Sequence, residues 1–200
     1  MSDEIRFGCV IEPSVQVVNG LLDVARHLAG DLGPKVTGVA WVPPHQYVAP
    51  LAMGSLGSAG GEEAAGEALR LATRELEEFG VQMAPPVLLR QGDAEGLIMV
   101  VLTSKGDELA AVTSLAASRL NEIGMDVQAL DTVGVTLALV TGEPAMQAVS
   151  QALPEGRDTP RGGWLVGGLC LHAGLTNTDG RGWSPVRMRY APLLRQGSRR

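Results

Sequence analysis

One arrangement of apolar residues occurs twice in this sequence, in the order strand, helix, glycine and strand. When the second copy is aligned with the first at a shift of 91 residues, Val24-Ala25 falls on Leu115-Ala116 and Leu32-Gly33 on Ile123-Gly124. The apolar residues of each helical segment are three and four positions apart, which is the spacing of one buried helix face. A glycine after such a segment favours the end of a helix. The repeat therefore predicts two units of similar architecture.

Short apolar runs before and after these helices predict the strands. We expect strands over residues 5–11, 36–42, 97–102, 126–130, 135–140 and 164–171, and helices that begin near Pro13, Glu62, Ser104 or Asp107, and Pro144. Residues 81–90 are extended in pattern, but Pro85-Pro86 limits them to an edge strand because proline has no amide hydrogen to donate. Beyond Ala173 the chain has no periodicity and is predicted to be loop.

The predicted fold class is α/β (α+β), with two ferredoxin-like βα lobes in tandem; a parallel α/β unit is the alternative for the first lobe. A chain of 200 residues is long enough for one large domain or two small ones. The first lobe is expected over residues 1–95 and includes a glycine-rich loop over 45–61. The second, a βαββαβ lobe, covers residues 96–173, and a basic tail covers 174–200.

Charge is distributed unevenly along the chain. Residues 1–156 have a net charge of −12, whereas residues 157–200 have a net charge of +6. Such an asymmetry is found in nucleic-acid-binding proteins, but also where a basic tail docks on the acidic body of its own chain or on a neighbouring subunit. We expect docking and no nucleic-acid partner, because large aromatic residues such as Trp164, Trp183 and Tyr190 are costly to expose. The arginines of this end that could bind phosphate are Arg181, Arg187, Arg189, Arg195, Arg199 and Arg200.

The expected compartment is the cytoplasm. The first residues are not a basic segment followed by an apolar run, as in a secretory signal, and no apolar stretch reaches the roughly 20 residues needed to span a bilayer. Cys9 and Cys170 both lie in apolar runs, a position typical of buried free thiols, although a disulfide between them is also compatible with the sequence. No contact with a membrane is expected.

Strong catalytic motifs are absent from the sequence: it has no G-x-S-x-G, H-E-x-x-H, C-x-x-C, Walker A or G-x-G-x-x-G pattern. We therefore predict no catalytic residues and no cofactor. Cys170 and His172 would share one face of a strand, where Cys9 or His45 could join them around a metal ion. Zinc needs four ligands, and this pair supplies only two of them. The pattern therefore favours a core cysteine beside a capped or surface histidine, and no metal is predicted.

Two segments are candidates for ligand binding. Residues 45–61 lack periodicity, and loops of this length are often functional. Such a loop could line a ligand pocket or a subunit pore, or be disordered without a role. The amides that follow Ser58 precede a predicted helix, and helix N-termini attract anions. The turn over residues 103–107 enters another predicted helix. The predicted ligand-binding residues are Gly54, Ser55, Gly57, Ser58, Thr103, Ser104 and Asp107.

Three family resemblances follow from these patterns. Residues 97–171, with the stretch DELAAVTSLAASRLNEIGMDVQALDT, resemble the ACT ligand-sensing domains. That resemblance implies a small ligand, often an amino acid, bound between domains near residues 103–107. Residues 5–97 resemble the universal stress proteins, some of which bind ATP, and MGSLGSAGG is similar to their phosphate loop. The element order over residues 5–123 resembles permuted bacterial microcompartment shell proteins.

The function expected from these observations is non-catalytic. We predict an oligomeric protein that senses a small molecule or regulates another protein, with a second copy of the chain as its partner. Two alternatives stay open at this point. One is a structural tile in the shell of a bacterial microcompartment, and the other is a nucleotide-binding protein of the universal stress type.

Overall fold

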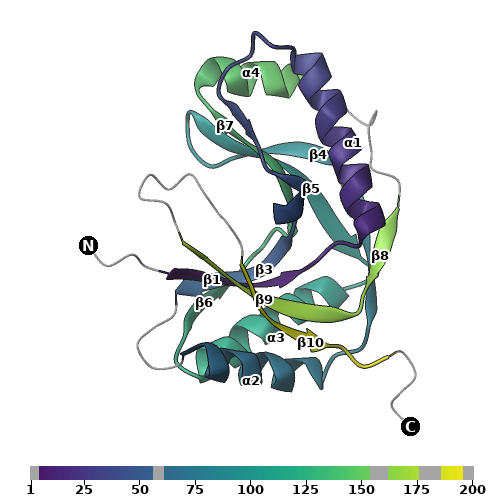
Figure 1. The fold of residues 1–200 in the computed structure, drawn as a ribbon, viewed down its shortest axis with the longest axis vertical. Helices are drawn as coiled ribbons and strands as arrows, with labels where there is room; N and C mark the ends of the chain where they lie inside the picture. Colours follow the sequence, from purple (N-terminus) through teal and green to yellow (C-terminus); the bar gives the residue numbers. More distant parts are fainter. Residues whose placement is uncertain (1–4, 56–60, 154–161, 176–185, 196–200) are drawn as a thin grey trace.

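The structure, a computed structural model, describes residues 5–55, 61–153, 162–175 and 186–195. These residues form two curled sheets of five strands each and four α-helices, a mixed α+β fold (Figure 1). In chain order, the elements are β1 (Ile5–Ile11), α1 (Val15–Leu32), β2 (Val39–Trp41), the 3-10 helix η1 (Pro44–Gln46), β3 (Ala49–Ser55), α2 (Gly61–Thr73), β4 (Phe79–Arg90), β5 (Glu95–Ser104), α3 (Glu108–Glu122), β6 (Asp126–Ala129), β7 (Gly134–Thr141), α4 (Glu143–Ala152), β8 (Gly163–Val166), β9 (Gly168–Leu175) and β10 (Val186–Pro192).

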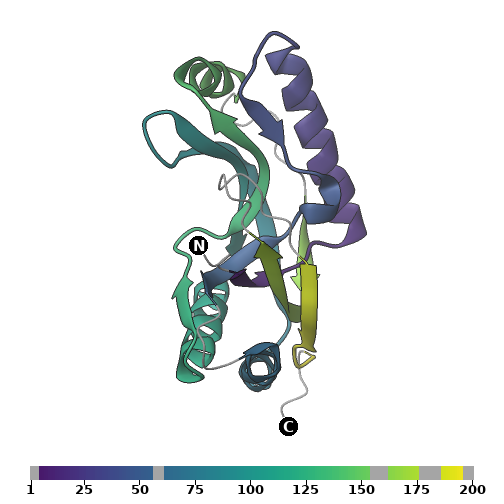
Figure 2. The same cartoon turned by 60° about the vertical axis from the view of Figure 1, so that its left-hand side comes forward.

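The strands are ordered β10-β9-β1-β3-β6 in one sheet, which we call sheet A, and β2-β7-β5-β4-β8 in the other, sheet B. Helices α2 and α3 lie below sheet A in Figure 1, and α1 and α4 lie at the other end of the molecule with sheet B (Figure 2). All ladders between the named strands are antiparallel, so the alternative of a parallel first unit is wrong.

The repeat is visible in the fold as two strand–helix–strand–strand units that exchange their middle strands. The outer strands of each unit pair with each other, β1 with β3 and β5 with β7, whereas β2 joins sheet B and β6 joins sheet A. The ladders therefore do not show ferredoxin-like lobes, because each sheet contains strands from both sides of residue 95. The boundary at residue 95 stays a prediction.

The two units also share an irregularity. Cys9 pairs with Ala52 and Val10 with Pro50, which leaves Leu51 as the extra residue of a bulge. In the other unit the extra residue is Leu137, between the partners of Ile98 and Met99. Both leucines are fully buried. This agreement in detail supports a common architecture for the two units.

The expected loop over residues 45–61 contains instead a central strand of sheet A. The segment lacks the alternation of a half-exposed strand because both faces of β3 are covered, so that Val48, Ala49, Leu51 and Ala52 are all buried. Pro50 is tolerated because it lies at the bulge. Pro85 and Pro86 lie at a bulge as well, in a part of β4 that has a partner on one side only, since β8 pairs with residues 79–82.

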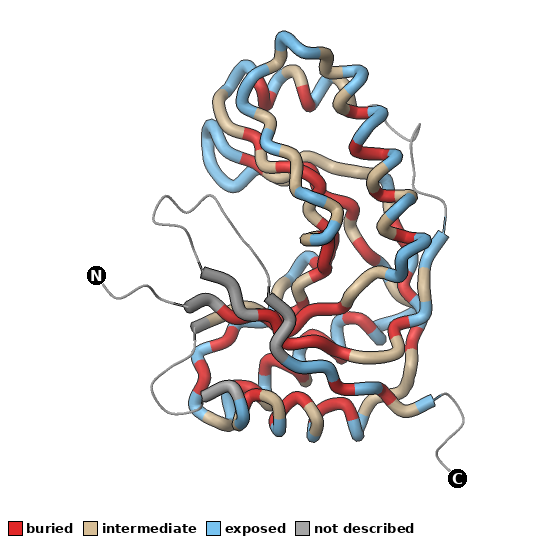
Figure 3. The backbone as a smooth tube through the Cα atoms, viewed as in Figure 1, coloured by how far each residue is buried: buried red, intermediate tan, exposed pale blue. Residues whose placement is uncertain are grey.

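Helix α1 begins near Pro13 and ends before a glycine, as predicted. The Ser14 side chain accepts a hydrogen bond from the Val17 amide (3.4 Å), and Gly33, with a φ of 69°, ends the helix. The buried stripe is Val17, Leu21, Val24, Ala25 and Leu28. This face and the inner faces of the strands form one core that extends through both sheets (Figure 3).

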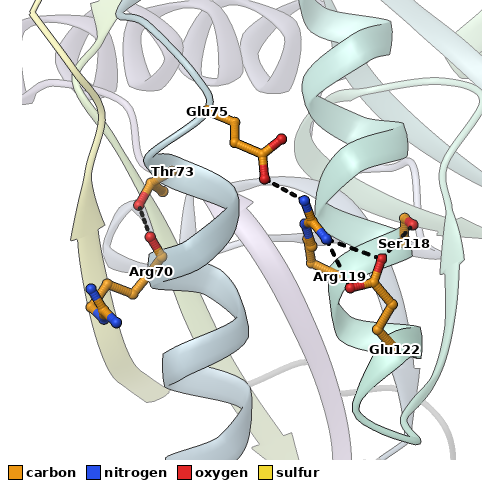
Figure 4. Close-up of polar contacts among 6 residues, drawn as sticks. All are labelled: Arg70, Thr73, Glu75, Ser118, Arg119 and Glu122. Atoms are coloured by element: carbon orange, nitrogen blue, oxygen red, sulfur yellow. Dashed lines mark hydrogen bonds and ion pairs between the residues drawn. The ribbon is translucent and has the colours of Figure 1, made fainter.

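Polar contacts join α2 to α3 on the outside of sheet A (Figure 4). The Arg119 guanidinium donates to Glu122 on its own helix (2.9 Å) and also to Glu75, just after α2. The side chain of Asn121 accepts from the amide of Val127 (2.8 Å) and donates to its carbonyl (2.9 Å), which attaches β6 to the end of α3. These bonds hold the edge strand that the second unit contributes to sheet A.

Part of the basic C-terminal segment docks on the chain itself. Residues 186–192, which were expected to be loop, form β10 at the edge of sheet A, paired with β9 and packed against α2. The hydroxyl of Tyr190 donates to the Gly167 carbonyl (3.1 Å), and Ala191 and Leu193 are buried. Periodicity did not reveal this strand because a bulge between Arg187 and Arg189 interrupts its alternation. None of the described helices is both long and apolar enough to cross a membrane.

A glycine inside α1 offers a simple test of the helix. Gly30 is exposed, and a methyl group there would meet nothing within 4 Å. We expect Gly30→Ala to raise the free energy of unfolding by up to about 1 kcal/mol, because alanine loses less backbone entropy in a helix. Urea denaturation measures the change. Gly33→Ala is the matched control and should destabilise, since φ at Gly33 is 69°; a loss of stability in Gly30→Ala would contradict the helix.

Candidate functional site

Helices α2 and α3 cover one face of sheet A, and the other face is turned toward sheet B (Figure 1). The side chain of Arg189, the ladder partner of Leu171, lies beside Gly66 of α2, so Leu171 shares the helix-covered face and the candidate site lies on the other one. Successive residues of a strand point to opposite faces. Leu169 and Leu171 of β9 belong to the main core, whereas Cys170 packs with Val10 and Val48 in a small separate cluster. His172 follows Cys170 by two positions and shares its face. The prediction that Cys170 and His172 lie on one face is confirmed.

The third member of the group is Glu12, directly after β1. Its Oε1 is 2.9 Å from Nε2 of His172, and the possible ligand atoms of Glu12, Cys170 and His172 all lie within 4.8 Å of one another. His172 is 5% exposed and Cys170 1%, whereas the Glu12 side chain is 31% exposed and links the group to solvent. Among the described residues, no other trio of histidine, cysteine or carboxylate side chains is so close.

One polar atom of the group is orphaned. Nδ1 of His172 is buried and has no hydrogen-bond partner among the described residues. An unsatisfied buried polar atom costs about 1–3 kcal/mol, so native proteins usually give it a water molecule, an ion or a protein partner. Beside the group is a cavity of about 130 Å³, lined by Glu12, Val166, Gly167, Gly168, Cys170 and Tyr190. This space is large enough for several water molecules.

The partners that the sequence suggested for this pair, Cys9 and His45, are wrong. Cys9 pairs with Leu171 and shares its face of sheet A, so it points into the main core. Burial first, and the neighbouring Cys170 second, raise the pKa of Cys9 far above its usual range, so its thiol stays protonated. His45 is exposed on η1. Both cysteines are free, which excludes the disulfide alternative. Glu12 was missed because 160 positions separate it from His172.

The predicted ligand-binding residues do not form one site. Gly54 and Ser55 lie in β3 and pair with Phe7 and Arg6 of β1, while Gly57 and Ser58 fall outside the described residues. Thr103 is exposed near the end of β5. The Ser104 hydroxyl accepts a hydrogen bond from the Leu109 amide (2.9 Å) and so caps α3, whereas Asp107 makes no capping bond with its side chain. The members of this set that the structure describes line neither of the two hollows reported in this section. Their role in ligand binding stays a prediction.

A second hollow lies between α2 and β10 on the outer side of sheet A. It has a volume of about 790 Å³ and is lined by Glu63, Ala64, Gly66, Glu67, Leu69, Arg70, Arg189, Tyr190, Ala191 and Pro192. Two arginines and two glutamates therefore share its walls, and Arg70 forms an ion pair with Glu67. Because opposite charges balance here, this hollow is a weaker candidate for chemistry than the Glu12–Cys170–His172 group.

Comparison with known proteins identifies the fold. No protein-family model and no curated protein matches this sequence. Solved structures do match. A phosphoesterase has a TM-score of 0.67 and 15% sequence identity, and the match covers 94% of this chain and 98% of that one. LigT of Escherichia coli (TM-score 0.63, 15% identity) and Usb1 of Kluyveromyces marxianus (TM-score 0.55, 11% identity) each match over 96% of this chain and 99% of their own. The chain shares their fold. LigT has also been solved with 3′-AMP, with ATP and with NADP+.

These likenesses overturn the functional expectations drawn from sequence. The resemblances to ACT domains, universal stress proteins and microcompartment shell proteins are wrong, because the solved structures that share this fold include a phosphoesterase, LigT and Usb1. The sensing or regulatory, shell-forming and stress-protein functions that depended on those resemblances are wrong with them. The resemblances failed because helices with glycine caps, joined to apolar strands, occur in many α+β folds, and the exchange of β2 and β6 leaves no local signal.

Proposed function

We propose that this protein binds a phosphoester of nucleotide size and hydrolyses it. The observation that carries the proposal is the likeness of the fold to a phosphoesterase and to LigT, which extends over nearly the whole of both chains. LigT holds 3′-AMP, ATP and NADP+ in solved structures, and these share a phosphate ester of a nucleoside. We infer a substrate of the same chemical class for this chain.

The groups that we assign to the chemistry are Glu12, Cys170 and His172. In the hydrolysis of 3′-AMP, a water oxygen adds to phosphorus, the ester P–O bond breaks, and the departing ribose oxygen takes up a proton. The water must be activated, either by a base or by a metal ion. Of the three histidines in the chain, His27 and His45 are exposed, so His172 is the imidazole placed beside a cavity-lining carboxylate.

The test is a hydrolysis assay on the full chain with 3′-AMP, ATP and NADP+ as probes, followed by chromatography of the products. We expect turnover of at least one probe, with kcat/KM reduced about 100-fold or more in His172→Asn, because the group that activates water is lost. His27→Asn is the matched control. Nδ1 of its exposed imidazole is 2.8 Å from the Asp23 carbonyl oxygen on the surface of α1, so turnover should be unchanged.

The thermal stability of each variant separates a loss of chemistry from a loss of folding. Glu12→Gln is a second variant at a partly exposed position and should also lower kcat/KM. Turnover that is equal in wild type, His172→Asn and Glu12→Gln would contradict the assignment of the site. The absence of both binding and turnover of all three probes would contradict the proposed function.

A further inference from the structure

We propose that Glu12, Cys170 and His172 form a binding site for one zinc-type divalent ion. The three side chains come from the end of β1 and from β9, and they bring a carboxylate, a thiol and an imidazole within 4.8 Å of one another. The alternation of β9 places Cys170 and His172 on one face of the strand. Because β9 pairs with β1 on one side and with β10 on the other, backbone hydrogen bonds hold both of these ligands in place. The site is therefore built on rigid elements.

The chemistry of the ligands selects the class of ion. Thiolate and imidazole are ligands for zinc and related transition metals, whereas magnesium and calcium prefer oxygen alone. Ligand bonds to zinc are about 2.0–2.3 Å long, so the atoms of the group that are farthest apart must move closer together to share one ion. Glu12, with a side chain 31% exposed, is the ligand with room to move. Binding releases the thiol proton of Cys170 to solvent, so affinity should rise with pH.

Two observations independent of the cluster point to a ligand at this place. Nδ1 of the buried His172 has no partner among the described residues, so the contact of Nε2 with Glu12 leaves the hydrogen-bonding capacity of the imidazole incomplete. The cavity of about 130 Å³ borders Glu12 and Cys170 and offers a place for a fourth ligand, a water molecule. Three protein ligands and one water are the arrangement of catalytic zinc sites.

An ion fits the group better than a covalent role for Cys170. The sulfur atom belongs to a residue that is 1% exposed, so a phosphoester cannot approach it closely, whereas an ion can enter past Glu12. The binding of the ion stands on these contacts alone. Only its use, to polarise a water molecule for attack on phosphorus, rests on the proposed function.

The experiment uses the full chain, stripped with a chelator and titrated with Zn²⁺ by calorimetry and with Co²⁺ by absorption spectroscopy. We expect one ion per chain and a near-ultraviolet band from charge transfer between thiolate and cobalt. Cys170→Ser should abolish the band and weaken zinc binding about 100-fold or more, since even residues that only support metal ligands change affinity by about 10–100-fold. The matched control Cys9→Ala should keep both, because Cys9 faces the main core.

A second pair of variants guards against misfolding of Cys170→Ser. Glu12→Gln, at a partly exposed position, should weaken zinc binding, whereas the exposed His45→Asn should not. No saturable binding of Zn²⁺ and Co²⁺, or a charge-transfer band that survives Cys170→Ser, would overturn the proposal. Hydrolysis that is unaffected by removal of the ion would leave the proposed function standing without the metal. Zinc binding without turnover of any phosphoester would support the metal site and contradict the proposed function.

Discussion

Replacement of Leu51 or Leu137 by alanine should lower the free energy of unfolding by about 2–5 kcal/mol, the range measured when a buried leucine is truncated and leaves a cavity. Each leucine is the extra residue of a bulge in the central strand pair of its unit, and each is fully buried. Because each leucine is packed in the main core, truncation to alanine leaves a cavity that the surrounding residues fill only in part.

Chemical denaturation of the two single variants measures this effect. Leu71→Ala is the matched control, since Leu71 of α2 is 43% exposed and should change stability by less than about 0.5 kcal/mol. Similar losses at positions 51 and 137 would support the equivalence of the two units. A negligible loss at either position would show that its bulge is not packed as described, and would count against the correspondence.

Gly54→Ala should destabilise the protein by about 1–3 kcal/mol or more, as expected for overpacking. A Cβ at this position would lie 1.9 Å from the Asp126 carbonyl oxygen and 2.7 Å from Cα of Val127, so β3 and β6 would have to separate. Backbone atoms cannot move aside as a flexible side chain can. The variant would therefore weaken the ladder that joins the second unit to sheet A.

The melting temperature of Gly54→Ala, compared with that of Gly80→Ala, tests this effect. Gly80 also lies in a strand, but a methyl group there would meet nothing within 4 Å, so that variant should be close to neutral. Equal stability of the two variants would contradict the close approach of β3 and β6. The comparison also helps to interpret Gly54 as a predicted ligand-binding residue. If Gly54→Ala unfolds the protein, any loss of ligand binding in that variant comes from the loss of the fold and not from a lost contact with the ligand.

The helices could be predicted from sequence to a large extent. The stripe of α1, its start near Pro13 and its end at Gly33 are local signals, and the structure contains each of them. The strand β3 could not be predicted in this way. Its alternation is hidden by burial on both faces and by Pro50 at a bulge, and both conditions depend on neighbours that are remote in sequence.

The candidate site shows the same limit. Period-two alternation was enough to place Cys170 and His172 on one face, and this held in the structure. The identity of the third member could not follow from spacing, because Glu12 reaches His172 only through the pairing of β1 with β9. Whether Cys9 or Glu12 joins Cys170 and His172 likewise depended on which face of sheet A packs against the helices.

The repeat on which the sequence is organised was determined by the sequence itself, since helix stripes, glycine stops and apolar strands are properties of nearby residues. Only the tertiary structure decided how the two copies combine. The middle strand of each copy pairs in the sheet of the other, β2 with β7 and β6 with β3. The physical reason is that the backbone groups of a strand can form hydrogen bonds with any exposed sheet edge whose register keeps the apolar side chains buried. Which edge a strand pairs with therefore depends on the whole fold.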